Sequence, residues 1–123
     1  TGKTSGLVVD SGESKTMCVP VYEGFPLYHA LNISSIGGKN ISDIILDGIV
    51  QTYPEFDREN VELIREVKQK MCKVPYLKDY DYYMSKENDI LKPEERLYKL
   101  PDETTIIEVS KESRLKASEL IFK

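Results

Sequence analysis

The first third of the chain alternates short apolar runs with turn residues, a pattern typical of β-strands. Gly6–Val9 is one apolar run, and Thr16–Tyr22 is a second run that is rich in β-branched residues. Together they predict a β-hairpin with its tip at Ser11–Lys15. A third short strand is predicted over Leu27–Ile33, after a turn at Gly24.

The apolar positions then change to a helical period. Ser34–Gly38 breaks the strand pattern, and Asn40 is a good N-cap for a helix that is predicted to run to Thr52. A second helix is predicted from about Asp57 to the residues before Pro75, because apolar positions again recur every three or four residues. The two apolar faces consist of Ile41, Ile44, Ile45 and Ile49 in the first helix and Leu63, Ile64, Val67, Met71 and Val74 in the second.

The last third is less regular. Residues 76–92 mix tyrosines with charged residues and predict loops with a short helical turn. Two strands are predicted over Arg96–Leu100 and Thr104–Val109, around a turn at 101–103, and a short helix over Lys116–Phe122. Because strands and helices mix along the chain, the pattern favours an α/β or α+β architecture.

The composition excludes several classes of protein. The 123 residues suffice for one core, and the formal net charge of −4 argues against a protein that grips nucleic acid through its phosphates. No apolar run approaches the roughly 20 residues that span a bilayer, and no secretory signal opens the chain. With only Cys18 and Cys72, we expect reduced thiols in an intracellular protein. Because the first residue is Thr1 rather than Met, we expect a piece of a longer protein.

The tip of the predicted hairpin is a candidate anion site. A tight turn exposes consecutive backbone N–H groups, and Gly12 lacks the Cβ that would keep a phosphate away from them. Asp10, at the end of the first strand, is suited to hold a divalent cation through water. The alternative is a plain hairpin turn, since Asp, Ser and Gly are favoured in turns for conformational reasons alone.

The second predicted helix offers another candidate site. Arg65, Lys68 and Gln69 are spaced i, i+3 and i+4, so they share one edge that is suited to contact a sugar or a base. The alternative is an ordinary solvated edge. His29 is the single histidine and has no partner at a spacing that supports a catalytic triad, so no catalytic residue is predicted.

Several segments, in the same order along the chain, resemble the actin family. Gly6–Gly12, Val19–Phe25 and Leu27–Ala30 match a signature stretch of actins. The resemblance then continues to the end of the chain through Gly37–Asp43, Ile64–Cys72, Tyr98–Asp102 and Ser118–Phe122.

The resemblance implies an α/β fold that forms part of the actin-like ATPase, a two-lobed protein with a nucleotide and a divalent cation in its central cleft. Residues 1–36 look like a phosphate-binding hairpin and strand, and residues 37–123 like a small helical subdomain with an antiparallel β-hairpin on the adenosine side. By resemblance, the backbone of Gly12, Glu13 and Ser14 faces the terminal phosphates, and Asp10 lies near the water shell of the metal. The residues implied on the adenosine side are Gly38, Arg65, Lys68 and Gln69.

Four positions depart from the actin pattern. Glu13-Ser14 stands where actins usually have Asp-Gly, Gln69 replaces a glutamate at the ribose, and Met17 replaces a histidine that helps to order the attacking water. A thioether neither transfers a proton nor donates a hydrogen bond. We therefore expect a divergent actin-like or actin-related protein and leave its hydrolytic activity open, while the isolated chain is expected to be inactive.

The expected function is that of a fragment of an actin-like, ATP-binding cytoskeletal protein that supplies part of the nucleotide cleft and of a filament or partner-contact surface. The alternative is a non-catalytic actin-related scaffold subunit of a larger assembly, such as a nuclear or dynactin-like complex. ATP or ADP with Mg²⁺ or Ca²⁺ is expected in the full-length protein and none on this fragment. Expected partners are the remaining actin-fold lobes and other actin-like subunits or actin-binding proteins, without direct contact to nucleic acid or membrane. We also expect artefactual self-association of the fragment, and a location in the cytoplasm, with the nucleus as the alternative.

Overall fold

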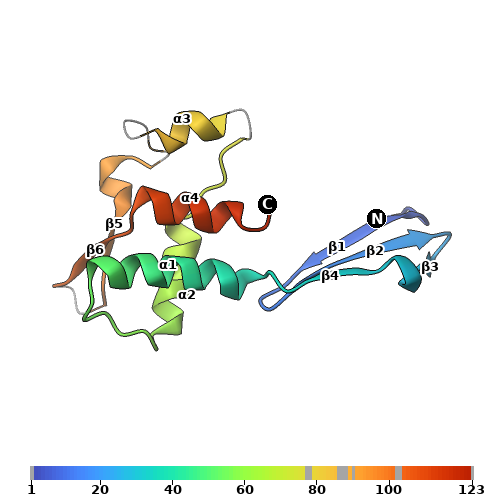
Figure 1. Cartoon of the computed structure of the whole chain (residues 1–123), viewed down its shortest axis with the longest axis horizontal. Coiled ribbons are helices and arrows are strands. Elements are labelled where there is room, and N and C mark those ends of the chain that lie inside the picture. Colours follow the sequence, from blue (N-terminus) through green and yellow to red (C-terminus); the bar gives the residue numbers. More distant parts are fainter. Residues whose placement is uncertain (1, 77–78, 86–88, 90, 102–103, 123) are drawn as a thin grey trace. The chain divides into compact units, whose positions relative to one another are not determined.

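The chain divides into two compact units, Thr1–Asn40 and Ile41–Lys123. The computed structural model describes residues 2–76, 79–85, 89, 91–101 and 104–122 (Figure 1). The expected boundary at residue 36 comes four residues before that of the compact units. It precedes helix α1 (Gly38–Thr52), which begins in the first unit and continues into the second.

The first unit contains a four-stranded antiparallel sheet with β2 in the middle. The predicted hairpin is confirmed, since β1 pairs with β2 along its whole length, from Gly6 opposite Val21 to Ser11 opposite Thr16. On its other side, β2 pairs with β3 at one end and with β4 at the other. The strands are β1 (Gly6–Ser11), β2 (Thr16–Tyr22), β3 (Phe25–Pro26) and β4 (Asn32–Ser34).

The single strand predicted over Leu27–Ile33 is wrong. A 3₁₀ turn (η1, Tyr28–Ala30) occupies its middle, where Ala30 N donates to Leu27 O at 3.0 Å and Leu31 N donates to Tyr28 O at 3.2 Å. These local bonds use the amides that a strand would offer to its neighbour, so only the residues of β4 pair with β2.

Apolar side chains of β1 are exposed on both faces of this sheet. Leu7, Val8 and Val9 retain 63%, 54% and 61% of their accessible surface. Because successive side chains of a strand point to opposite faces, neither face of β1 is covered within the described part of the chain. Among residues 2–40 only Gly37 is buried, so the sheet has no apolar core of its own.

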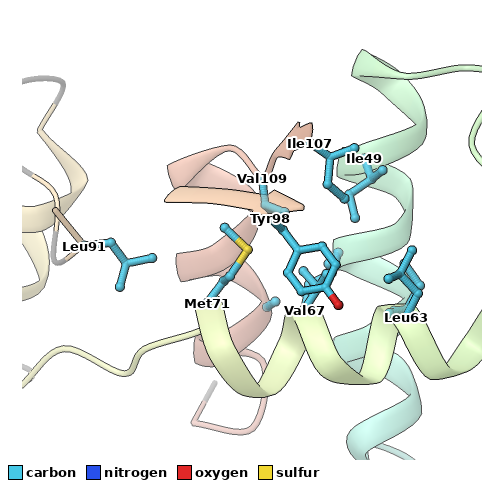
Figure 2. Close-up of a cluster of buried hydrophobic side chains, with 11 residues drawn as sticks. Ile49, Leu63, Val67, Met71, Leu91, Tyr98, Ile107 and Val109 are labelled. Atoms are coloured by element: carbon cyan, nitrogen blue, oxygen red, sulfur yellow. The ribbon is translucent and has the colours of Figure 1, made fainter. Parts of the chain in front are cut away.

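The second unit packs helices around a small β-hairpin. Figure 2 shows the core, where Val67 and Met71 of α2 lie close to Tyr98 of β5 and Ile49 of α1 meets Ile107 of β6. A fully buried isoleucine or leucine contributes about 1.5–3 kcal/mol, so this cluster is the main source of stability in the unit. The further elements are α2 (Val61–Met71), α3 (Tyr80–Met84), η3 (Pro93–Arg96), β5 (Leu97–Lys99), β6 (Ile106–Glu108) and α4 (Lys111–Glu119).

The elements predicted for the second unit are present, but α2 and α4 have other bounds than predicted. α2 begins at Val61 rather than near Asp57, because Asn60 caps it by accepting a hydrogen bond from Leu63 N at 3.2 Å. The last helix, predicted from Lys116, begins five residues earlier behind its cap Ser110. The antiparallel β5–β6 pair and the short α3 confirm the expectations for this region, while residues 102 and 103 of the predicted turn lie outside the described residues.

A buried ion pair holds Asp89 against α4. Arg114 has a side chain only 4% exposed and donates from both terminal nitrogens to the Asp89 carboxylate, at 3.0 and 2.7 Å, while its Nε donates to Val109 O. Arg96 approaches the same carboxylate at 3.2 Å. Burial alone would raise the pKa of Asp89, but the two guanidinium groups and the Leu91 N–H outweigh it and hold the pKa below its ordinary value.

Candidate functional site

The tip of the first hairpin, residues Gly12–Lys15, is called the β1–β2 turn. All four residues are exposed, and Gly12 N closes the turn by donating to Lys15 O at 2.9 Å. At its base, the Thr16 hydroxyl donates to Ile36 O at 2.8 Å, so the Ser11 hydroxyl is the donor in its 2.9 Å bond to Thr16 Oγ1. These bonds fix the turn to the segment that leads into α1.

The carbonyl groups of the turn point toward the first residues of α1. Gly38 N donates to Gly12 O at 2.9 Å, and Lys39 N donates to Glu13 O at 2.8 Å. A trans peptide places its N–H opposite its C=O, so the amide hydrogens of Glu13 and Ser14 point away from α1. Two adjacent N–H groups directed away from α1 in an exposed turn are donors of the type found in anion-binding nests.

Asp10 and Met17 lie beside this turn. They are directly opposite each other in β1 and β2, so their side chains share one face of the sheet, and Asp10 is exposed. No group of three His, Cys, Asp or Glu side chains that could hold a metal ion occurs in the described part of the chain. A cation at Asp10 would therefore need water molecules and a ligand's own oxygen atoms to complete its coordination.

Arg65 and Gln69 line a surface hollow of about 320 Å³ on α2. Arg65 also pairs with Glu62 at 3.2 Å, with both side chains largely exposed. Lys68 lies outside the lining of the hollow and donates from Nζ to Ser42 Oγ of α1 at 3.0 Å. Of the three residues predicted on this edge, the hollow therefore brings two together.

Glu66, at the same hollow, joins α2 to the β5–β6 hairpin. It accepts a 2.6 Å bond from Lys70 Nζ and a short bond from the Tyr98 hydroxyl. The Lys70 bond, then the Tyr98 bond, lower the pKa of Glu66, while the Glu66 bond raises the pKa of Tyr98 to about 12. Glu66 is thus a fixed negative charge beside Arg65 and Gln69.

The predicted site residues divide between the two units. Asp10, Gly12, Glu13, Ser14 and Gly38 lie in the first unit, at the β1–β2 turn or the start of α1 that is bonded to it. The three α2 residues lie in the second unit. Gly38 is adjacent to the turn, but its N–H is used by Gly12 O.

The sequence interpretation missed Gly37 and misassigned Asn40. Gly37 is buried against the turn, and Asn40 lies inside the first turn of α1 rather than at its N-cap. The available signal was the pair Gly37-Gly38 at the start of a predicted helix, because a glycine pair there allows a close approach of two backbones.

Comparison with known proteins identifies one matching family model, and three similar relatives are described below. A family model described as Actin matches residues 1–123. The chain is 34% identical over 122 residues to Actin-related protein 2 of Schizosaccharomyces pombe and 35% to that of Saccharomyces cerevisiae. It is 32% identical to Actin-related protein 2 of Caenorhabditis briggsae. Each match covers 98% of this chain and 30% of the relative, so the chain spans about a third of the length of these relatives.

Proposed function

The chain belongs to the actin family, and from that premise we propose that it forms one wall of the nucleotide cleft of a longer actin-related protein. In this proposal residues 1–36 contact the phosphates and residues 37–123 contact the adenosine. The ligand is ATP or ADP with Mg²⁺ or Ca²⁺, and the whole protein acts with other actin-like subunits or actin-binding proteins in the cytoplasm.

The orientation of the β1–β2 turn is the observation that carries the proposal. Its carbonyl groups are turned toward α1 and its next two amide hydrogens are turned outward at an exposed surface. A triphosphate supplies oxygen atoms that accept from such amides, and hydrogen bonds to charged acceptors contribute about 1.5–3 kcal/mol each. The donor set of the turn therefore fits a phosphate group.

Asp10 completes the phosphate side of the proposed site. In the proposal, its exposed carboxylate, beside the turn, holds the water shell of a divalent cation. Bound with its cation, ATP supplies a reactive phosphoanhydride bond. The chain's own part is to hold the terminal phosphates with backbone amides and to keep the cation near them through Asp10.

On the adenosine side, Arg65 and Gln69 supply a guanidinium and an amide at one hollow. Both groups hydrogen-bond to sugar hydroxyls and to the edges of a base. Lys68, held by Ser42, supports the same edge of α2, and Gly38 contributes by lacking a side chain at the start of α1.

Met17 favours a second candidate function, that of a non-catalytic scaffold subunit that binds nucleotide without turnover. It lies directly across from Asp10, where a group that orders the attacking water would be useful, and its thioether cannot take or donate a proton.

Calorimetric titration of Mg-ATP into the full-length protein that contains this chain, together with a phosphate-release assay, tests both functions. We expect micromolar binding by the full-length protein and no measurable binding by the isolated 123 residues, because a cleft needs two walls. Phosphate release by the bound protein favours the ATPase, and binding without release favours the scaffold. If the full-length protein shows no binding, the proposed function is wrong.

A further inference from the structure

Gly37 packs against the β1–β2 turn so closely that no side chain fits there. A Cβ on Gly37 would lie 2.6 Å from Glu13 O, 2.7 Å from Gly12 O and 2.7 Å from Lys15 N. All three are backbone atoms, which cannot move aside as the end of a flexible side chain can. Any larger residue at position 37 must therefore displace the turn or the start of α1.

Asn40 fixes Gly37 from within α1. Its Oδ1 accepts from Gly37 N at 2.9 Å, and its own N–H donates to Gly37 O at 3.2 Å. The first bond is one half of a capping box, because the side chain of Asn40, in the first turn of the helix, accepts from the backbone N–H of the residue that precedes the helix. Between these two residues, the N–H groups of Gly38 and Lys39 are held in line with the carbonyls of the turn.

This arrangement accounts for the backbone donors at the start of α1. The first amides of a helix lack partners within the helix, and here Gly12 O and Glu13 O accept from the amides of Gly38 and Lys39. The partial positive charge at the helix N-terminus favours carbonyl oxygen atoms there. Because each carbonyl is coupled to the next residue's N–H through a rigid peptide plane, the same bonds set the direction of the Glu13 and Ser14 amides.

We propose that Gly37 and Asn40 are positioning residues for the terminal phosphates of the nucleotide. Neither residue needs to touch the ligand. Together they hold the β1–β2 turn with the Glu13 and Ser14 amides directed outward. The inference rests on the proposed function, since it explains how this turn is kept ready for a triphosphate.

Two substitutions in the full-length protein test the inference, each with a matched control. Gly37→Val forces a side chain against the turn, whereas Gly6→Val adds the same side chain where a Cβ meets nothing within 4 Å. Asn40→Ala removes the acceptor for Gly37 N, whereas Asn40→Asp keeps it. Calorimetry gives the affinities for Mg-ATP and for AMP, which lacks the terminal phosphates, and hydrogen exchange reports the amides of Gly38 and Lys39 without any nucleotide.

We expect Gly37→Val and Asn40→Ala to weaken Mg-ATP binding about 10-fold or more, because at least one hydrogen bond to a charged acceptor is lost. The affinity for AMP should stay within about twofold of the wild type. The Gly38 and Lys39 amides should exchange faster in both variants, while both controls behave like the wild type. If the Gly37→Val variant does not fold, the comparison of Asn40→Ala with Asn40→Asp tests the positioning role. Unchanged ATP-to-AMP ratios in folded variants would overturn the positioning role, whereas a wild type that binds no nucleotide would overturn the proposed function itself.

Discussion

Met17 is the single residue on which the choice between ATPase and scaffold depends most. It faces Asp10 across β1 and β2, next to the β1–β2 turn, so a side chain at position 17 lies on the same face of the sheet as the proposed cation site. The actin pattern places a histidine there, and histidine is the side chain that most often transfers protons near neutral pH.

Met17→His in the full-length protein should raise the rate of phosphate release by about tenfold or more, since a positioned general base contributes 10²–10⁴-fold. The measurement is phosphate release at saturating Mg-ATP. Cys18→His is the matched control, because residue 18 lies on the opposite face of the same strand and should leave the rate unchanged. Equal rates in the two variants would show that position 17 has no part in hydrolysis.

At the scale of whole elements, a glycine determines how closely α1 and α4 pack. A Cβ on Gly48 would lie 2.2 Å from Ser113 Oγ and 2.8 Å from Ser113 Cβ. The hydroxyl can rotate away, but the Cβ of Ser113 is fixed by the helix, so the contact can only be relieved if the helices move apart.

Gly48→Ala should therefore lower the free energy of unfolding by about 1–3 kcal/mol, the usual cost of overpacking, although alanine is the better helix former. Urea unfolding of the single and double variants with Ser113→Gly measures the coupling between the two positions. We expect the double variant to recover much of the loss caused by Gly48→Ala. Strictly additive effects would contradict the steric explanation.

The buried Asp89–Arg114 pair also acts at this scale, because it ties Asp89 to α4. Asp89→Ala leaves a buried guanidinium without its carboxylate and should lower the free energy of unfolding by about 3–5 kcal/mol. Because the folded pKa of Asp89 is below its ordinary value, its contribution is present above about pH 4 and is lost as the pH falls through the folded pKa.

Urea unfolding between pH 7 and pH 3 checks both parts of this prediction. Glu112→Gln is the control, because Glu112 and Lys116 form an exposed ion pair, and exposed ion pairs contribute little to stability. A loss no larger in Asp89→Ala than in Glu112→Gln would mean that the buried pair adds no stability.

The periodic spacing of apolar residues predicted the elements whose buried face is apolar. It did not predict the bounds of an element whose buried face is polar. The hairpin of β1 and β2 and the helices α1 and α2 follow from alternating or helical apolar positions. The start of α4 did not, because Arg114 and Ser118 are among its buried residues and are satisfied by hydrogen bonds to Asp89, Val109 O and Arg114 O. Gly37 was missed for a different reason, since its contact with Gly12 joins residues far apart in sequence.

At the scale of the whole molecule, the sheet of the first unit lacks a covering layer within the described residues. β1 is an edge strand with apolar side chains exposed on both faces, and the chain spans about a third of the length of its relatives. An uncovered apolar edge strand is a template for pairing with a second chain.

The isolated chain should therefore self-associate, and Val8→Lys should reduce the association by placing a charge on this edge. Light scattering as a function of concentration measures it. Val74→Lys is the control, because Val74 is similarly exposed, at 56% against 54% for Val8, but does not lie on a strand. A monomer at high concentration for the unmodified chain would contradict the prediction.

In the proposed function, the β1–β2 turn binds phosphate through its outward amides. Hydrogen–deuterium exchange of the full-length protein, with and without nucleotide, tests this binding mode at the amides of Glu13 and Ser14. Mg-ATP should slow their exchange by about tenfold or more, as for amides that gain a hydrogen bond to a charged acceptor, and adenosine should not. Protection by Mg-ATP elsewhere in the protein, with these two amides unchanged, would show that the turn does not bind the phosphates.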